Sequence, residues 1–137
     1  MNNEMQSNQF PDALVSSLQN IRSALDTEIS VVNTGIGNFE PNVRMAAEER
    51  LRDLELKRND IDFFLQTGSR LEGTELMSSI NNLTQSLKDL NDIQTGILTR
   101  LEKFFNEFLN DYTTANELRT LSEEIQVFIE EIQKLAM

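Results

Sequence analysis

Carboxylates are the only side chains in this sequence dense enough to suggest chemistry. Glu123-Glu124 and Glu130-Glu131 lie seven residues apart near the C-terminus, and Glu48-Glu49 forms a third pair. Neighbouring carboxylates can act in acid–base catalysis or bind a hard metal ion. In the heptad register of the C-terminal residues, however, the two later pairs occupy positions that face solvent. We therefore interpret all three pairs as solvated helix surface.

The residue types that most catalytic sites require are missing. The sequence has no histidine and no cysteine, which excludes Ser-His-Asp and Cys-His catalysis, imidazole acid–base chemistry and ordinary zinc sites. Gly35 and Gly37 lack the third glycine and the preceding strand of a dinucleotide-binding fingerprint. We predict that the protein is not an enzyme, with no catalytic residues, cofactor, metal or small-molecule substrate.

The charge of the chain argues against direct binding of nucleic acid. Twelve Lys and Arg stand against twenty-three Asp and Glu, for a formal net charge of −11, whereas phosphate backbones are bound by clustered cationic side chains. The least acidic stretch, Arg44 to Arg58, alternates basic and acidic residues. This alternation indicates a salt-bridged helix face.

No feature of the sequence indicates a membrane protein or a secreted one. No apolar run approaches the ~20 residues that span a bilayer. The first residues have neither the positive nor the apolar region of a signal peptide, and Asn2 stands where N-myristoylation requires glycine. With no cysteine for disulfides, we predict an intracellular location, in the cytoplasm or the nucleus.

Helices must position all of these side chains, and one helix dominates the pattern. From Thr74 to Tyr112 the apolar residues alternate at spacings of four and three, as in a heptad seam. We predict a long central helix at about 74–111, roughly 58 Å long at about 1.5 Å per residue. Its candidate protein-interaction seam comprises Leu76, Ile80, Leu83, Leu87, Leu90, Gln94, Ile97, Leu101, Phe104, Phe105 and Phe108.

Three shorter helices are predicted around the central one, at about 11–33, 41–66 and 115–136. Proline at the first helical position favours the starts at Pro11 and Pro41. The sequence Thr114-Ala115-Asn116-Glu117 matches a capping box for the last start. We predict an all-α fold, with residues 1–9 as a disordered tip and 10–137 as a single helical domain.

The central helix changes character along its length, which suggests how the helices assemble. Its first half has a narrow apolar stripe between polar flanks, whereas the stripe broadens beyond Ile93. We expect the 41–66 helix along the first half, the 115–136 helix along the second, and the 11–33 helix completing one end. Gly96 marks a close approach or a bend. The unequal lengths favour an elongated four-helix coiled coil or bundle over a plain up-down-up-down bundle. We expect it to be oligomeric, because the polar-flanked half of the central helix needs something to cover its seam.

Three polar residues interrupt the seams: Glu28, Arg58 and Gln94. Polar residues at such positions often set helix register or oligomer state. Arg58 could pair with Glu28 if the first two helices are antiparallel, or each side chain could reach water from a partly exposed seam.

Eight phenylalanines occur against one tyrosine and no tryptophan, and Phe104, Phe105 and Phe108 cluster together. Two interpretations remain open. The cluster forms part of the core, or it forms a groove for a partner helix, because helix-in-groove contacts use such apolar spacing.

Two functional hypotheses follow, and no motif assigns the chain to a family. The first is a structural or adaptor subunit that acts by coiled-coil and helix-bundle association with protein partners, as a homo-oligomer or in a hetero-complex. The alternative is a small acidic inhibitor or nucleic-acid mimic that binds a basic nucleic-acid-binding protein. Salt-sensitive binding to such a protein would distinguish the second from the first.

Overall fold

The protein is all-α in every part that the computed structural model describes, residues 12–93 and 95–136. The α-helices are α2 (Asp12–Gly35), α3 (Pro41–Thr67), α4 (Gly73–Ile93), α5 (Thr95–Lys103) and α6 (Tyr112–Ala136). Short 3-10 turns at Ile36–Asn38 and Gly68–Arg70 join the first three, and a π-helical turn, Phe104–Phe108, follows α5. The predicted all-α class is confirmed. The predicted disordered tip lies outside the described residues.

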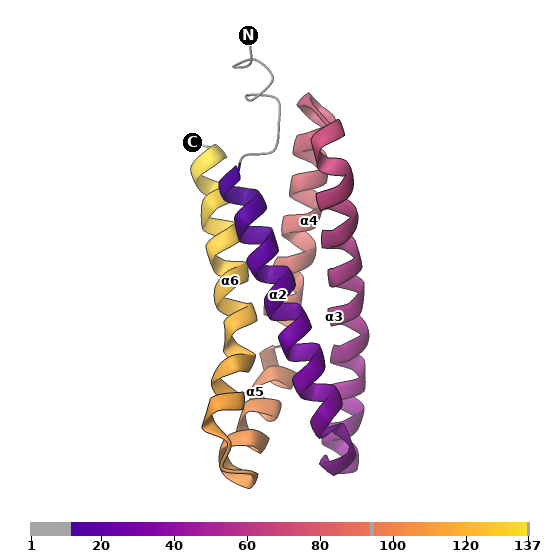
Figure 1. Cartoon of the computed structure of the whole chain (residues 1–137), viewed down its shortest axis with the longest axis vertical. Coiled ribbons are helices and arrows are strands. Elements are labelled where there is room, and N and C mark those ends of the chain that lie inside the picture. Colours follow the sequence, from indigo (N-terminus) through magenta and orange to yellow (C-terminus); the bar gives the residue numbers. More distant parts are fainter. Residues whose placement is uncertain (1–11, 94, 137) are drawn as a thin grey trace.

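Four helical stretches run in alternating directions around one core, with α4 and α5 together forming the third (Figure 1). α2 descends, α3 returns, α4 and α5 descend, and α6 returns. α2 contacts α3 and, more extensively, α6, while α4 and α5 both lie between α3 and α6. The expectation that unequal helix lengths would prevent an up-down-up-down course was therefore wrong. It failed because α4 and α5 together match the length of their neighbours.

The central helix departs from its prediction. The structure describes one helix before residue 94, α4, and another after it, α5. The stretch predicted as the central helix ends with the π turn at Phe108 and not at residue 111. Gln94 lies outside the described residues. Gly96 is exposed, and an added Cβ would meet no atom within 4 Å, so close approach does not explain this glycine.

The last helix begins three residues earlier than the capping box predicted. The backbone N–H of Thr114 donates to Asp111 Oδ1 at 3.0 Å, and the Thr114 hydroxyl donates to Asp111 Oδ2 at 2.6 Å. Asp111 therefore caps α6, and Thr114 is the third helical residue instead of the cap. The preceding Asn110 has a positive φ of 54° and reverses the chain.

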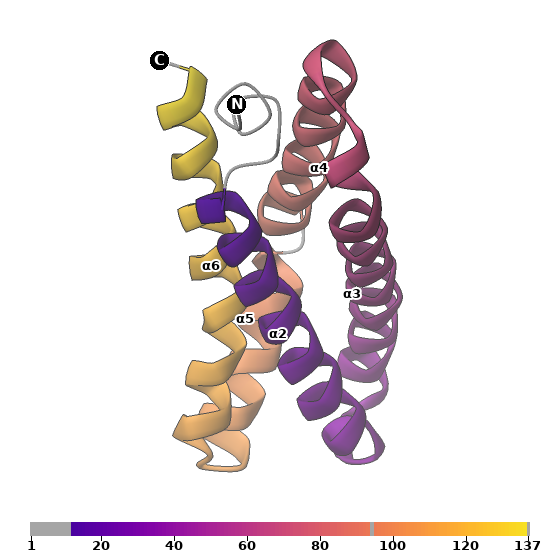
Figure 2. The same ribbon diagram turned by 45° about the horizontal axis from the view of Figure 1, so that its top comes forward.

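The central helix is not divided between two neighbours as predicted. α3 does contact α4 and α6 does contact α5, as expected, but α6 also contacts α4 and α3 also contacts α5. Figure 2 shows α2 crossing the bundle obliquely, from beside α6 to the start of α3, as does Figure 1. The first helix therefore packs along the bundle, and does not merely complete one end.

One hydrophobic core runs through the whole bundle. All helices and the loop before α3 contribute fully buried or nearly buried side chains, among them Leu18, Leu25, Phe39, Leu54, Ile61, Leu87, Leu101, Leu118, Ile125 and Phe128. At the α2–α3 connection, Gly35 is buried with Phe39 and Phe105 so near that an added Cβ would meet their rings at 3.2 and 3.3 Å. This glycine is needed for a close approach.

Candidate protein-binding surfaces

The conspicuous carboxylates of the sequence do not converge on a site. Glu123 and Glu130 are exposed, and Glu124 and Glu131 are half-buried. Among the described residues, no three acidic side chains are placed to hold a metal ion. The prediction that the protein is not an enzyme stays a prediction.

The most buried charges form one ion pair, between Glu28 of α2 and Arg50 of α3. Their exposed fractions are 1% and 2%. Arg50 Nη2 donates to Glu28 Oε1 at 3.0 Å, and Arg50 Nε donates to Glu28 Oε2. The guanidinium therefore binds the carboxylate in a bidentate manner. Burial raises the pKa of the Glu28 carboxyl above its ordinary value, and the bonds from Arg50 oppose that rise.

Glu28 thus neither pairs with Arg58 nor reaches water, the two possibilities that the sequence left open, although α2 and α3 do run antiparallel. Arg58 follows Arg50 by eight residues on α3, and its Nη1 donates to Asp26 Oδ1 at 3.2 Å. Sequence reasoning missed Arg50 because it lies beside the heptad series of α3. The only sign in the sequence that Arg50 is buried is its position next to Leu51 and Leu54, on the apolar side of the helix.

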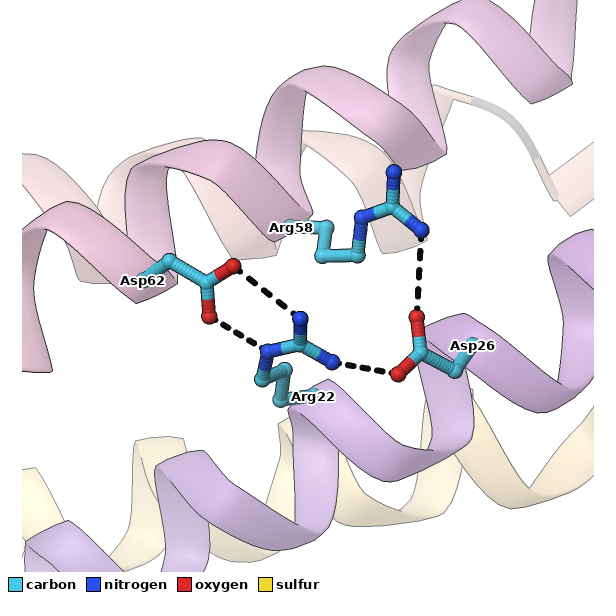
Figure 3. A network of polar contacts seen from close by, with 4 residues as sticks. All are labelled: Arg22, Asp26, Arg58 and Asp62. Atoms are coloured by element: carbon cyan, nitrogen blue, oxygen red, sulfur yellow. Dashed lines mark hydrogen bonds and ion pairs between the residues drawn. The ribbon is translucent and has the colours of Figure 1, made fainter.

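A second polar network joins the same two helices nearer the surface (Figure 3). Arg22 lies between two carboxylates, donating to Asp62 Oδ2 at 3.1 Å, to Asp62 Oδ1 and to Asp26 Oδ2. The bond to Asp62 is the largest cause of a raised Arg22 pKa. Both networks hold α2 against α3, and so these charges serve packing within the bundle.

The candidate interaction seam is largely covered by the chain itself. Its residues within the core are Leu76, Ile80, Leu83, Leu87, Leu90, Leu101, Phe104 and Phe105. Ile97 is partly buried and Phe108 is exposed, while Gln94 lies outside the described residues. Helices α3 and α6 of the same chain thus contact the side of α4 that contains the predicted interaction seam. Binding through the seam stays a prediction, and it would require the bundle to open.

An apolar groove lies instead on the outside of the α3–α4 hairpin. It encloses about 490 Å³, and its lining combines the apolar Phe63, Phe64, Leu71 and Leu83 with neutral polar side chains and the acidic Asp60. Phe63 is 66% exposed, although phenylalanine is among the most apolar residues. A partly open groove with an exposed aromatic ring and a polar rim is typical of a protein-binding surface.

A second exposed apolar group lies at the opposite end of the bundle, where α5 turns into α6 (Figure 1). Phe108, Leu109 and Tyr112 are all exposed there. Behind them, Phe39, Phe104 and Phe105 pack edge to face, with ring centroids 4.8 to 6.0 Å apart. The phenylalanine cluster thus divides into the buried Phe104 and Phe105, which belong to the core, and the exposed Phe108. A groove for a partner helix stays a prediction.

Comparisons with known proteins identify no relative. No protein-family model, curated protein or solved structure matches the chain. Among the described helices, none has both the length and the apolar character needed to cross a membrane.

Proposed function

We propose that this protein is a non-enzymatic adaptor that binds a partner protein through the outer groove of the α3–α4 hairpin. The observation that carries the proposal is the exposed Phe63 ring at the rim of a groove with apolar lining. Exposed aromatic anchors beside a pocket often supply much of the affinity of an interface. The protein would still act by helix association, but the contact would lie in the α3–α4 groove and not in the buried seam.

The groove suits one helix of a partner protein. Ser79, Asn82 and Ser86 recur on α4 at spacings of three and four, and Asp60, Phe63 and Thr67 do so on α3. Two helices side by side therefore offer parallel walls, into which an amphipathic helix places apolar residues at the same spacing. An intracellular setting, with the protein in a homo-oligomer or hetero-complex, belongs to the same proposal.

The test is a comparison of bound partners between matched surface variants. Tagged wild type, Phe63→Ser and Val127→Ser are purified from the native cell, since Val127 is an exposed apolar residue on another helix. We expect Phe63→Ser to lose the main partner and Val127→Ser to keep it, with all three melting alike by circular dichroism. The same partners at the same yield from all three would overturn the proposal.

The alternative function, an acidic inhibitor that mimics nucleic acid, is favoured by one observation. On α6, Arg119 pairs with Glu102 and Lys134 with Glu131, which leaves Glu117, Glu123, Glu124 and Glu130 without an ion pair among the described residues. Binding to a basic nucleic-acid-binding protein that weakens steeply with salt, and is lost when these four become glutamine, would support mimicry. Such a result, with Phe63→Ser binding normally, would replace the adaptor proposal.

A further inference from the structure

The α4 wall of the α3–α4 groove is bordered by carboxylates. Ser79, Asn82 and Ser86 line the groove from α4 at spacings of three and four. The same spacing continues to Glu75 before this row and to Asp89 after it. Residues so spaced share one face of a helix, and so both acidic residues lie on the groove side of α4.

The α3 wall adds a third carboxylate. Asp60 is exposed and is the one charged residue in the groove lining that the structure describes. Neither Asp60 nor Glu75 forms an ion pair within the described residues. Asp89 accepts a hydrogen bond from the neutral side chain of Gln85, with Nε2 and Oδ1 2.8 Å apart. Three negative charges thus border the groove.

The cations of these two helices lie elsewhere. Arg58 is turned toward α2, where it donates to an aspartate. Lys88 follows Ser86 by two residues, about 200° around α4, and so lies on another side of that helix. Lys57 and Arg70 precede and follow the groove residues of α3 in the sequence, and neither lines the groove. The groove therefore has a negative net charge.

The same groove has an apolar floor, to which Phe63, Phe64, Leu71 and Leu83 contribute. An apolar floor between anionic edges is complementary to a helix with apolar residues on one face and lysine or arginine beside them. The formal net charge of the chain, −11, acts in the same direction, because it attracts cationic partners from a distance.

We propose that the α3–α4 groove binds a basic amphipathic helix of a partner protein. The apolar face of that helix contacts Phe63 and Leu83. Its lysines and arginines meet Asp60 on one wall and Glu75 and Asp89 on the other. The inference rests on the proposed function, because it names the class of partner for the same groove.

Two other occupants are less consistent with these charges. A second copy of the chain would bring two strongly acidic molecules together. Of the described helices only α5 has more basic than acidic residues, and its apolar Leu101 is buried in the core, so α5 is not free to enter the groove of another copy. An acidic helix would be repelled by the carboxylates on both walls. Both occupants serve as outcomes of the test.

The absence of tryptophan from the chain leaves tryptophan fluorescence free to report on a bound peptide. The probes are three synthetic peptides of about 18 residues, long enough to form a helix. They share leucines at helical spacings of three and four, with one tryptophan in the middle of that pattern. The remaining positions alternate alanine with lysine in the first peptide, with glutamate in the second and with glutamine in the third.

Each peptide is titrated with the full-length protein, and the shift of tryptophan emission on burial gives the affinity. We expect the lysine peptide to bind about tenfold more tightly than the glutamine peptide, as two or three exposed ion pairs would provide, and the glutamate peptide to bind most weakly. The double variant Asp60→Lys/Glu75→Lys should reverse this order, and Asp60→Asn/Glu75→Gln should reduce the differences. Phe63→Ser should weaken all three peptides.

The matched control is Glu55→Lys/Glu107→Lys. It changes the net charge by the same amount at two exposed residues that do not line the groove, so the order of affinities should stay that of the wild type. Because Asp60 and Glu75 are exposed, their variants should keep the fold, which circular dichroism checks.

Equal affinity of the three peptides would overturn the inference, as would a preference for lysine that survives Asp60→Lys/Glu75→Lys. Tighter binding of the glutamate peptide, or no binding of any peptide, would do the same. A dimer in sedimentation equilibrium that Phe63→Ser dissociates would place a second copy in the groove. Equal affinities that Phe63→Ser lowers together would leave the proposed function standing, since the groove would then bind helices without selecting their charge. The native-partner comparison with Phe63→Ser tests the proposed function separately.

Discussion

The α2–α3 interface contains two ion-pair sites that differ mainly in burial. Glu28 and Arg50 are enclosed by the core, with side chains 0% and 3% exposed. The side chains of Arg22, Asp26, Arg58 and Asp62 remain between 30% and 45% exposed. Both sites join the same helices with the same types of side chain. They therefore isolate the effect of burial on what a salt bridge contributes.

From this difference in burial we expect the Glu28–Arg50 pair to act on helix register more than on stability. Two charges removed from water recover their desolvation cost only while they stay paired and hydrogen-bonded. Any shift of α2 along α3 that separated Glu28 from Arg50 would leave two charges in the core. The half-exposed network imposes a weaker penalty, because water can solvate its members when they separate.

The largest expected effect comes from Arg50→Ala, which leaves Glu28 buried without its main partner. We expect a loss of about 3–5 kcal/mol in the free energy of unfolding, the usual cost of an unpaired buried charge. Urea denaturation followed by circular dichroism measures it. Arg52→Ala, an exposed arginine on the same helix, is the control. Similar losses in the two variants would show that burial does not distinguish them.

Replacing both Glu28 and Arg50 by apolar residues should avoid the loss of stability expected for Arg50→Ala. In Glu28→Leu/Arg50→Met, two apolar side chains fill the space of the pair, and we expect stability equal to wild type or higher by up to about 4 kcal/mol. The same denaturation experiment tests this. A double variant as unstable as Arg50→Ala would mean that the pair stabilises the fold beyond its effect on register.

The half-exposed network should respond less, and it should respond to salt. Arg22→Ala removes the contacts to Asp26 and Asp62, and because solvent screens a side chain 35% exposed, we expect a loss of at most about 1 kcal/mol. At 1 M NaCl this loss should shrink, since the Debye length is then only about 3 Å. The Arg50→Ala loss should persist in the same salt. Equal salt dependence would remove the distinction between the sites.

The smallest effect is expected at a half-buried contact near the surface, the Asp111 cap of α6. Hydrogen bonds from Thr114 lower the Asp111 pKa below its ordinary 3.8. A carboxylate with a lowered folded-state pKa stabilises the fold above its unfolded pKa, and this contribution disappears as pH falls through the folded value. The melting temperature of Asp111→Asn should therefore lie slightly below wild type at pH 7, and the two should converge below pH 3.8. A difference that stays constant with pH would contradict the capping role.

Local sequence signals were sufficient for most of the helices. Pro41 and the glycines near 35 and 68 punctuate the chain, and α3 spans Pro41–Thr67 where 41–66 was predicted. The heptad spacing also identified the buried side of α4, from Leu76 to Leu90. These features depend on backbone preference and on apolar periodicity, both of which act within a few turns of helix.

What covers each apolar face depends on tertiary packing. A periodic stripe shows which side of a helix avoids water, but an intrachain helix and a partner helix satisfy it equally well. The seam of α4 was predicted to contact the 41–66 helix and a partner, and instead α3 and α6 of the same chain cover it. Likewise, the pairing of Glu28 with Arg50 instead of Arg58 depends on how far α2 slides along α3.

The candidate surfaces were the least predictable part, for the same reason. Phe108 belongs to the buried seam by its spacing, and a π turn places it outside. Phe63 and Phe64 are neighbours of one type, yet one is exposed and the other buried. The positions of most helices and of their apolar faces follow from the amino-acid sequence, because both depend on local interactions. Which apolar residues remain available to a partner was decided by the packing of helices distant in sequence.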